Sequence, residues 1–206
     1  MDGLLVDTEP LWFETETEVM KRLGGSWSRA DQESLLGGSM AHTVGYLLAR
    51  AATPAAPEEI ERWMMDGMLD RAAAGRVATR PGARELLAAV AAAGVPYALV
   101  TGSLRPFADA VLAGTGLRFP VTVTGDDVTR PKPDPEPYLL AAKLLGTDPE
   151  RCVALEDSPN GVASATGAGC RVVAVPSLLP IPPAAGRLVV PSLAGVTLHT
   201  LRALAA

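Results

Sequence analysis

From residue 83 onward, helical patterns alternate with short apolar runs, and this alternation constrains the fold more than any other feature. The apolar runs predict strands at 96–101, 121–124, 152–155, 171–175 and, more weakly, 187–190. The helical patterns lie at 83–93, 105–113, 135–145, 162–168 and 197–203. Short buried strands that alternate with helices form parallel sheets covered on both faces. The sequence therefore predicts an α/β fold with a doubly wound parallel-sheet core.

The block before this core, residues 8–78, carries helical patterns and no strand signal. Its helices are predicted at 8–23, 28–36, 41–52 and 57–74. Trp12, Trp27 and Trp63 all fall in this block, and we expect them in its core. We therefore expect three parts, which are a first core motif at 1–7, a helical insert at 8–78 and the α/β core at 79–206.

The composition is that of a globular protein and argues against two classes of partner. Of the 206 residues, 48% are hydrophobic and 20% are charged, the net charge is −5, and no basic tract suggests nucleic-acid binding. The longest apolar run, 86–100, is broken by Gly94 and Pro96 and is shorter than the ~20 residues of a membrane span. The acidic start lacks the basic region of a signal peptide, so we expect a cytoplasmic location. Cys152 and Cys170 are expected to be free thiols, and nothing indicates the oligomeric state.

One strand is expected to end at a pair of acids. Cys152-Val-Ala-Leu-Glu-Asp-Ser-Pro-Asn-Gly161 is an apolar run that stops at Glu156, Asp157 and a turn. In open parallel sheets, ligands bind at the carboxyl ends of the strands. The acids therefore indicate a ligand site; a simple cap of the next helix by Asp157 or Ser158 is the alternative.

Another predicted strand ends in Thr101-Gly102-Ser103. A hydroxyl and free backbone N–H groups at such a turn suit a phosphate oxygen, while a simple helix cap explains the same residues. Asp2 and Asp7 stand near the first residue, where acids are usually just solvated.

Lys132 lies in the segment Arg130-Pro-Lys-Pro-Asp-Pro135. The prolines on both sides restrict the backbone around its charge, which suggests that the charge neutralises a phosphate or a cluster of carboxylates. A solvated lysine in a proline-rich loop is the alternative.

Four stretches of the sequence, in this order, resemble the four motifs of the haloacid dehalogenase superfamily, in its phosphatase and phosphomutase branch. They are Met1-Asp-Gly-Leu-Leu-Val-Asp-Thr-Glu9, Thr101-Gly-Ser103, Lys132-Pro133, and Glu156-Asp157-Ser158 with Gly161. The resemblance covers essentially the whole chain and makes the helical insert a cap. It implies a Rossmann-like core, Mg²⁺ as the cofactor and a small phosphorylated metabolite as the substrate.

The resemblance also implies roles for individual residues. Members of the branch attack phosphorus with an aspartate, and water then cleaves the aspartyl-phosphate. By resemblance, Asp2 is the general acid and base. Thr101, with Gly102 and Ser103, binds the phosphoryl group, and Lys132 offsets the charge of the nucleophile and the phosphate. The implied metal ligands are Asp2, Glu156 and Asp157.

The first motif departs from the family pattern. The family's nucleophile is an aspartate two residues before the acid/base aspartate, at the end of an apolar strand. Asp2 has only Met1 before it, so this chain lacks both the nucleophile and the first core strand. We expect that the natural polypeptide begins upstream of Met1, because the other motif residues survive; a product that has given up catalysis is the alternative. The chain as given is predicted to be impaired or inactive.

The lead hypothesis is therefore a Mg²⁺-dependent phosphatase that hydrolyses a sugar phosphate or a phosphoglycolate-type metabolite. One alternative is a sugar phosphomutase of the same branch, and another is a non-catalytic protein that binds a phosphorylated ligand. Specificity is expected to reside in the cap. Residues 36–42 are either a mobile loop over the site or a simple turn between helices.

Overall fold

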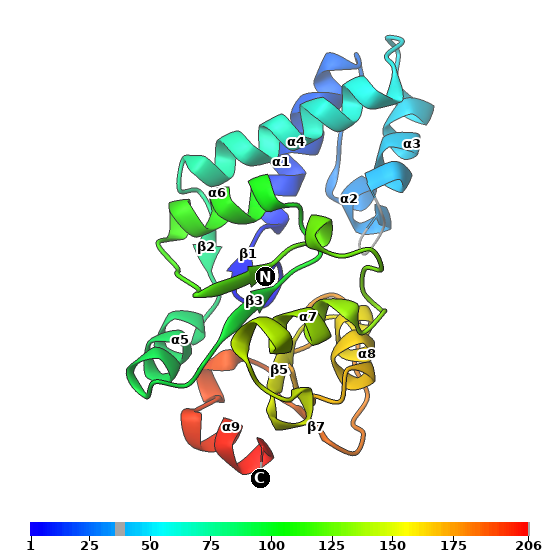
Figure 1. Ribbon diagram of the computed structural model, residues 1–206. Helices are drawn as coiled ribbons and strands as arrows, with labels where there is room; N and C mark the ends of the chain where they lie inside the picture. The colour runs from blue at the N-terminus through cyan, green and yellow to red at the C-terminus, as the bar shows by residue number, and fades with distance from the viewer. Residues whose placement is uncertain (36–39, 206) are drawn as a thin grey trace.

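The computed structural model describes residues 1–35 and 40–205, in which a helical part lies against an α/β part (Figure 1). The helices are α1 (Glu9–Arg22), α2 (Arg29–Leu35), α3 (Met40–Arg50), α4 (Pro57–Ala73), α5 (Ala83–Ala92), α6 (Arg105–Thr115), α7 (Glu136–Leu145), α8 (Pro159–Gly167) and α9 (Leu198–Ala205). The strands are β1 (Val6–Asp7), β2 (Ala78–Thr79), β3 (Ala98–Val100), β4 (Val121–Val123), β5 (Val153–Glu156), β6 (Arg171–Ala174) and β7 (Arg187–Val189). Every predicted helix and strand is present, with small shifts at its ends. Residues 36–39 of the predicted cap loop lie outside the described residues.

Helix α1 shows how the sequence builds the helical part. Glu9 and Pro10 stand in its first turn and Lys21 and Arg22 in its last, which suits the helix dipole. Its apolar face packs against α4. The core of the helical part consists of Val19, Met20, Leu23, Val44, Leu47, Ile60 and Met64. Trp12, Trp27 and Trp63 pack partly buried against this cluster, which confirms the expectation for these three side chains.

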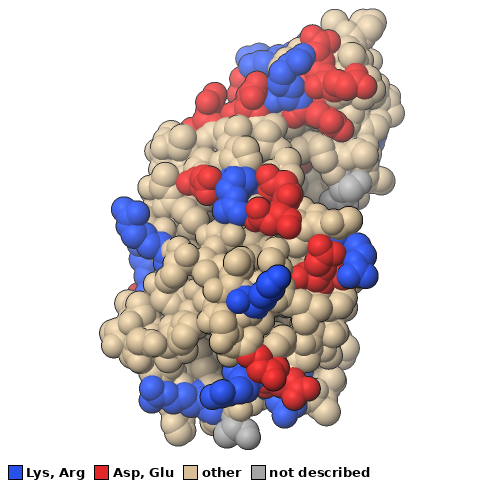
Figure 2. Space-filling view, viewed as in Figure 1, with Lys and Arg blue, Asp and Glu red and all other residues tan. Residues whose placement is uncertain are grey.

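Ion pairs also join α1 to α4 at the surface. Arg71 of α4 lies 2.9 Å from a carboxylate oxygen of Glu18 and 3.3 Å from one of Glu14. Figure 2 shows acidic side chains gathered around basic ones over this end of the molecule. Because the carboxylates of these pairs are 38% and 48% exposed, each pair contributes at most about 1 kcal/mol, and apolar packing accounts for most of the attachment between the two helices.

A short antiparallel ribbon, not predicted from the sequence, connects the two parts. In this ribbon β1 pairs with β2, with Val6 opposite Thr79 and Asp7 opposite Ala78. The sequence analysis described residues 1–7 only as a first core motif and found no strand signal in 8–78, so it missed both strands of the ribbon. Strands of two residues show no readable alternation of apolar and polar side chains. Both backbone connections between the helical part and the α/β part therefore run through this ribbon.

The predicted parallel sheet is present, but it is divided. Strand β3 pairs in parallel with β4, and β5, β6 and β7 form a second parallel group in this order. Within the described residues, no strand pairs β3 with β5. The parallel sheet of the core therefore consists of two half-sheets.

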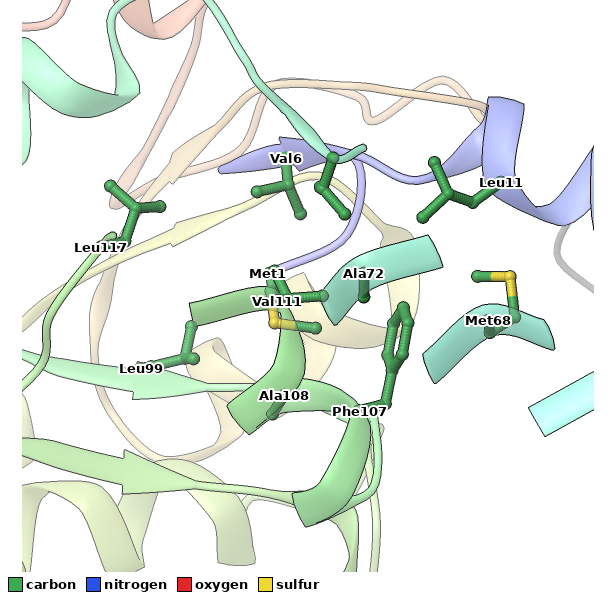
Figure 3. Packing of buried hydrophobic residues seen from close by; sticks show 11 residues of the cluster. Met1, Val6, Leu11, Met68, Ala72, Leu99, Phe107, Ala108, Val111 and Leu117 are labelled. Carbon is green, nitrogen blue, oxygen red and sulfur yellow. The ribbon is translucent and has the colours of Figure 1, made fainter. Parts of the chain in front are cut away.

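Helices cover the two half-sheets. Helix α7 contacts β3 and β4, α8 contacts β5 and β6, and α9 contacts β5. A separate apolar cluster joins the helical part to the α/β part and contains Met1 and Val6 together with side chains of α4 and α6 (Figure 3). Met68 and Ala72 of α4 belong to this cluster. The cluster therefore packs the first residues of the chain against both parts.

Two further expectations concern the cysteines and the membrane. Cys152 is half-buried and Cys170 is buried, and both are free, as predicted. None of the helices within residues 1–35 and 40–205 combines the length and the apolar character needed to cross a bilayer.

Candidate active site

The carboxyl ends of β3 and β5 point to one edge of the α/β part, where the predicted site residues gather. Thr101 directly follows β3, Glu156 is the last residue of β5, and Asp157 comes next. The Ser103 hydroxyl donates to Asp2 Oδ2 over 2.8 Å, which joins the start of the chain to the end of β3. The structure thus brings the first, second and fourth motifs together at this edge.

Asp2 is held by two hydroxyls. Besides Ser103, Thr8 donates to its other carboxylate oxygen, Oδ1, over 2.9 Å. Thr8 is buried and occupies the N-cap position of α1, yet its side chain makes no cap hydrogen bond there. Sequence analysis missed Thr8, because it placed this residue at the start of the predicted helix 8–23.

The Thr101-Gly102-Ser103 turn is ordered by its own hydroxyl. The buried Thr101 Oγ1 accepts a hydrogen bond from the Ser103 backbone N–H over 3.1 Å. Gly102 is exposed at the tip of the turn. This geometry places a hydroxyl and a glycine backbone where an anion can approach, although the same hydrogen bond also stabilises the turn by itself.

Lys132 pairs with Glu156 rather than with solvent. Its Nζ lies 2.5 Å from Glu156 Oε1 and donates to the Val100 carbonyl over 3.2 Å. The Tyr138 hydroxyl donates to the same Glu156 oxygen over 2.5 Å. Tyr138 lies on α7 and was not predicted, because only the packing of α7 on the sheet brings it to β5. Lys132 therefore connects the third motif to the fourth and to the end of β3.

The charges in this group shift its pKa values in opposite directions. Burial by itself raises the pKa of Glu156, but the Lys132 ammonium outweighs this effect and the net pKa lies below its usual value. Burial and the adjacent Glu156 carboxylate hold the pKa of Tyr138 well above its usual value. Glu156 is therefore an anion and Tyr138 a neutral donor at neutral pH.

Asp157 differs from Glu156 in its surroundings. Among the described residues, no side chain donates a hydrogen bond to its carboxylate. Burial raises its pKa to about 6, the Met1 α-amino group opposes this rise, and Glu156 adds to it. The backbone of Gly3 runs close by, and a Cβ on Gly3 would lie 2.2 Å from Asp157 Oδ2. A residue larger than glycine at this position would therefore displace the carboxylate.

The donor chemistry of this edge fits Mg²⁺ in part. Carboxylate oxygens are the ligands that Mg²⁺ prefers, and Asp157 offers such oxygens without a competing side-chain donor. One oxygen of Glu156 accepts hydrogen bonds from Lys132 and Tyr138, and each oxygen of Asp2 accepts one from a hydroxyl. Within residues 1–35 and 40–205, no group of three or more His, Cys, Asp and Glu is arranged to hold a metal ion. The metal set of Asp2, Glu156 and Asp157 stays a prediction.

Gly161 of α8 makes room for the Glu156 carboxylate, and this gives a testable expectation. A Cβ on Gly161 would lie 1.9 Å from Glu156 Oε2. We expect Gly161→Ala to lower the free energy of unfolding by about 1–3 kcal/mol, because the buried carboxylate must move. Gly167→Ala in the same helix is the matched control, since its Cβ would meet Pro135 at an ordinary 3.6 Å. That control should gain about 0.5–1 kcal/mol, and equal effects in urea denaturation would contradict the assignment.

The strand ends of the parallel sheet bring together an acid pair, a lysine and hydroxyls, and a helical part is inserted after the first motif. Together these features define a Rossmann-like hydrolase with a helical cap. The chain belongs to the haloacid dehalogenase-like hydrolases, because its residues 1–175 match that family.

Relatives and solved structures agree with this membership. Protein CbbY of Rhodobacter capsulatus is 35% identical over 190 residues, which cover 86% of this chain and 83% of that protein. Hexitol phosphatase A of Escherichia coli is 49% identical over 96 residues, and this match spans 46% of this chain and 44% of that protein. The crystal structure of CbbY from Rhodobacter sphaeroides in complex with phosphate has a TM-score of 0.82 and 31% identity, and covers 98% of this chain and 96% of that one. A mutant of the same protein was solved with xylulose-(1,5)bisphosphate.

Proposed function

We propose that this chain forms a Mg²⁺-dependent phosphatase acting on a small phosphorylated metabolite of the sugar phosphate or phosphoglycolate type. The observation that carries the proposal is the gathering of Asp2, Thr101 and Asp157 with the Lys132–Glu156 pair at one sheet edge. The relatives support the substrate class, since one is a hexitol phosphatase and another was crystallised with phosphate and with a sugar bisphosphate.

Each residue has a chemical task in this proposal. Asp2, oriented by Thr8 and Ser103, gives a proton to the leaving oxygen and later takes one from water. Thr101, with the backbone of Gly102 and with Ser103, binds phosphoryl oxygens. Lys132 brings its positive charge to the end of β3 and keeps Glu156 ionised.

The metal and the nucleophile complete the proposed site. Asp157, with Asp2 and Glu156 beside it, would hold Mg²⁺, which when bound offsets the negative charge of phosphoryl oxygens. The attacking aspartate would stand immediately before Met1, where this chain has no residue. We therefore propose that the 206-residue chain binds its ligands but turns them over slowly or not at all.

Metal binding can be tested without turnover. We expect MgCl₂ to raise the melting temperature of the protein, because a ligand that binds only the folded state stabilises it. Asp157→Asn should abolish the rise, since it removes an anionic oxygen donor, while Asp70→Asn on the exposed face of α4 should keep it. A rise of the same size in the Asp157 variant would exclude Asp157 as a metal ligand.

Assays of phosphate release complete the test. We expect sugar phosphates, hexitol phosphates or phosphoglycolate to raise the melting temperature further, with little or no release of phosphate. Rapid Mg²⁺-dependent release by a verified 206-residue product would contradict the proposal that the chain is impaired. Isomerisation of a sugar monophosphate without net phosphate release would instead support the phosphomutase alternative. If the natural full-length product binds these ligands and never turns them over, the non-catalytic alternative holds.

A further inference from the structure

The two cysteines of the chain lie next to each other at the amino ends of β5 and β6. In this parallel pair, Val153 stands opposite Arg171, and the Arg171 N–H donates to the Cys152 carbonyl over 3.0 Å. Cys152 and Cys170 each come one residue before this pair, so they stand opposite each other in the same register. Neighbouring strands lie about 4.8 Å apart. This spacing falls within the range of about 4.4–6.8 Å that separates the Cα atoms of a disulfide.

Both cysteine side chains lie on the same face of this half-sheet. Opposite residues of two paired strands project to one face, and the face alternates along each strand. Ala154 and Val172, each two residues further along its strand, belong with Cys170 to one buried apolar cluster, and Cys152 packs against that cluster. Side chains of α7 and α8 complete the cluster. The two thiols therefore share one environment under these helices.

The two thiols differ in their access to solvent. Cys152 is half-buried and its thiol donates to the Asp148 carbonyl over 3.4 Å, while Cys170 is buried. Burial raises the pKa of the Cys152 thiol, and it raises the pKa of the Cys170 thiol to about 11. Because the thiolate is the reactive form, both cysteines react slowly at neutral pH and faster as the pH rises. Cys152 is the one that a reagent in solution reaches first.

A bond between these thiols would enclose the fourth motif. The two cysteines lie at the amino ends of their strands, whereas Glu156 and Asp157 lie at the carboxyl end of β5. The closed ring, residues 152–170, would contain both acids and all of α8. A ring of this length restricts the unfolded chain and so stabilises the folded one. The bond would therefore fasten the far end of the strand that carries the two acids.

We propose that Cys152 and Cys170 form a redox modification site, at which a small-molecule disulfide such as oxidised glutathione converts the two thiols into one intramolecular disulfide between β5 and β6. The Cys152 thiolate attacks one sulfur of the oxidant, forms a mixed disulfide and releases one thiol. The Cys170 thiolate then attacks Cys152 Sγ, the mixed disulfide breaks, and the second thiol leaves. The protein gives up two protons and two electrons, and the oxidant becomes two thiols. This site does not depend on the proposed function.

The test incubates the reduced 206-residue protein with excess oxidised glutathione, blocks the remaining thiols by alkylation and digests the product with trypsin. Because no Lys or Arg lies between Cys152 and Arg171, both cysteines fall in one peptide, 152–171. We expect this peptide to carry no alkyl group and to be lighter than the reduced peptide by two hydrogen atoms. Cleavage after Glu156 should leave its two fragments joined. Closure should be faster at pH 9 than at pH 7.

Three results of this experiment would overturn the proposal. They are two alkylated thiols after prolonged incubation, a glutathione adduct that persists on Cys152, and a disulfide between two copies of the chain. Cys170→Ser shows what such an adduct looks like, because it removes the thiol that resolves the mixed disulfide.

A matched control moves the thiol by one residue. In the double variant Cys152→Ser, Val153→Cys, the new thiol projects from the opposite face of the half-sheet, away from Cys170. We expect this variant to form no intramolecular disulfide, and closure as fast as in the parent would contradict the role of the register.

The melting temperature gives a second readout. The closed parent should melt at least about 3 °C above the reduced parent, and a reducing agent should reverse the rise. A closed form that melts at or below the reduced form would show that the bond distorts β5 and β6, and would reject the site.

Discussion

Lys132→Met is expected to lower the free energy of unfolding at pH 7 by about 3–5 kcal/mol, because it leaves a buried carboxylate without its cation. The Glu156 side chain is only 5% exposed, and Lys132 is its only ionic partner among the described residues. Burial, then opposed only by the Met1 α-amino group and the Tyr138 hydrogen bond, should raise the pKa of Glu156. Urea denaturation at several pH values measures the loss.

The pH dependence of this loss has a definite sign. With Lys132 present, the lowered pKa of Glu156 means that its carboxylate contributes stability above the unfolded pKa of about 4.5, and this contribution disappears as the pH falls through the folded value. The deficit of Lys132→Met should therefore be largest near neutral pH and shrink in acid. The double variant Lys132→Met, Glu156→Gln should recover more than half of the loss. If the double variant is as unstable as the single one, unpaired charge is not the cause.

Glu16→Gln is expected to stabilise the protein at pH 8 by about 1–3 kcal/mol. Glu16 on α1 is only 4% exposed and accepts a hydrogen bond from the Trp27 indole over 3.1 Å. Burial raises its pKa to about 7, the Trp27 bond opposes the rise, and the nearby Glu9 adds to it. A rise from 4.5 to about 7 corresponds to roughly 3 kcal/mol as an upper limit. Glutamine keeps an acceptor for the indole without the buried charge.

The sign of the effect again follows from linkage. Because the folded state holds the Glu16 proton more tightly than the unfolded state, the protein loses stability as the pH rises from about 4.5 to 7, and above that range the cost is constant. The unfolding free energy of Glu16→Gln should lack this decline, so the two proteins should converge near pH 4.5. Glu61→Gln, at an exposed position of α4, is the control and should follow the parent. Parallel pH curves for Glu16→Gln and the parent would contradict the raised pKa.

The parts of the fold that depend on local pattern could be predicted from the sequence. The apolar run before Glu156 predicted β5, and the helices on both sides of it followed from their periodicity. The ribbon of β1 and β2 was missed, because four residues of strand carry no pattern. The sequence analysis expected a missing core strand, but which strands border the division, β3 and β5, depends on packing between distant segments, which no local window contains.

In the candidate site, too, residues recognisable from a local motif were predicted, and residues placed by long-range packing were not. Asp2, Lys132 and Asp157 were found because their types and order match a family pattern. Thr8 was passed over, since it stood at the start of the predicted helix 8–23, while the structure turns its hydroxyl to Asp2. Tyr138 was missed because its role depends on how α7 lies across the sheet.

The β1–β2 ribbon has a mechanical consequence. The backbone enters the helical part through β1 and leaves it through β2, and the two strands are bonded to each other, with the Arg80 N–H also donating to Leu5 O over 2.8 Å. Two separate connections would each bend on their own. Here the two connections are hydrogen-bonded into one two-stranded link, so neither can bend without the other, and this link lies directly next to Thr8, whose hydroxyl donates to Asp2.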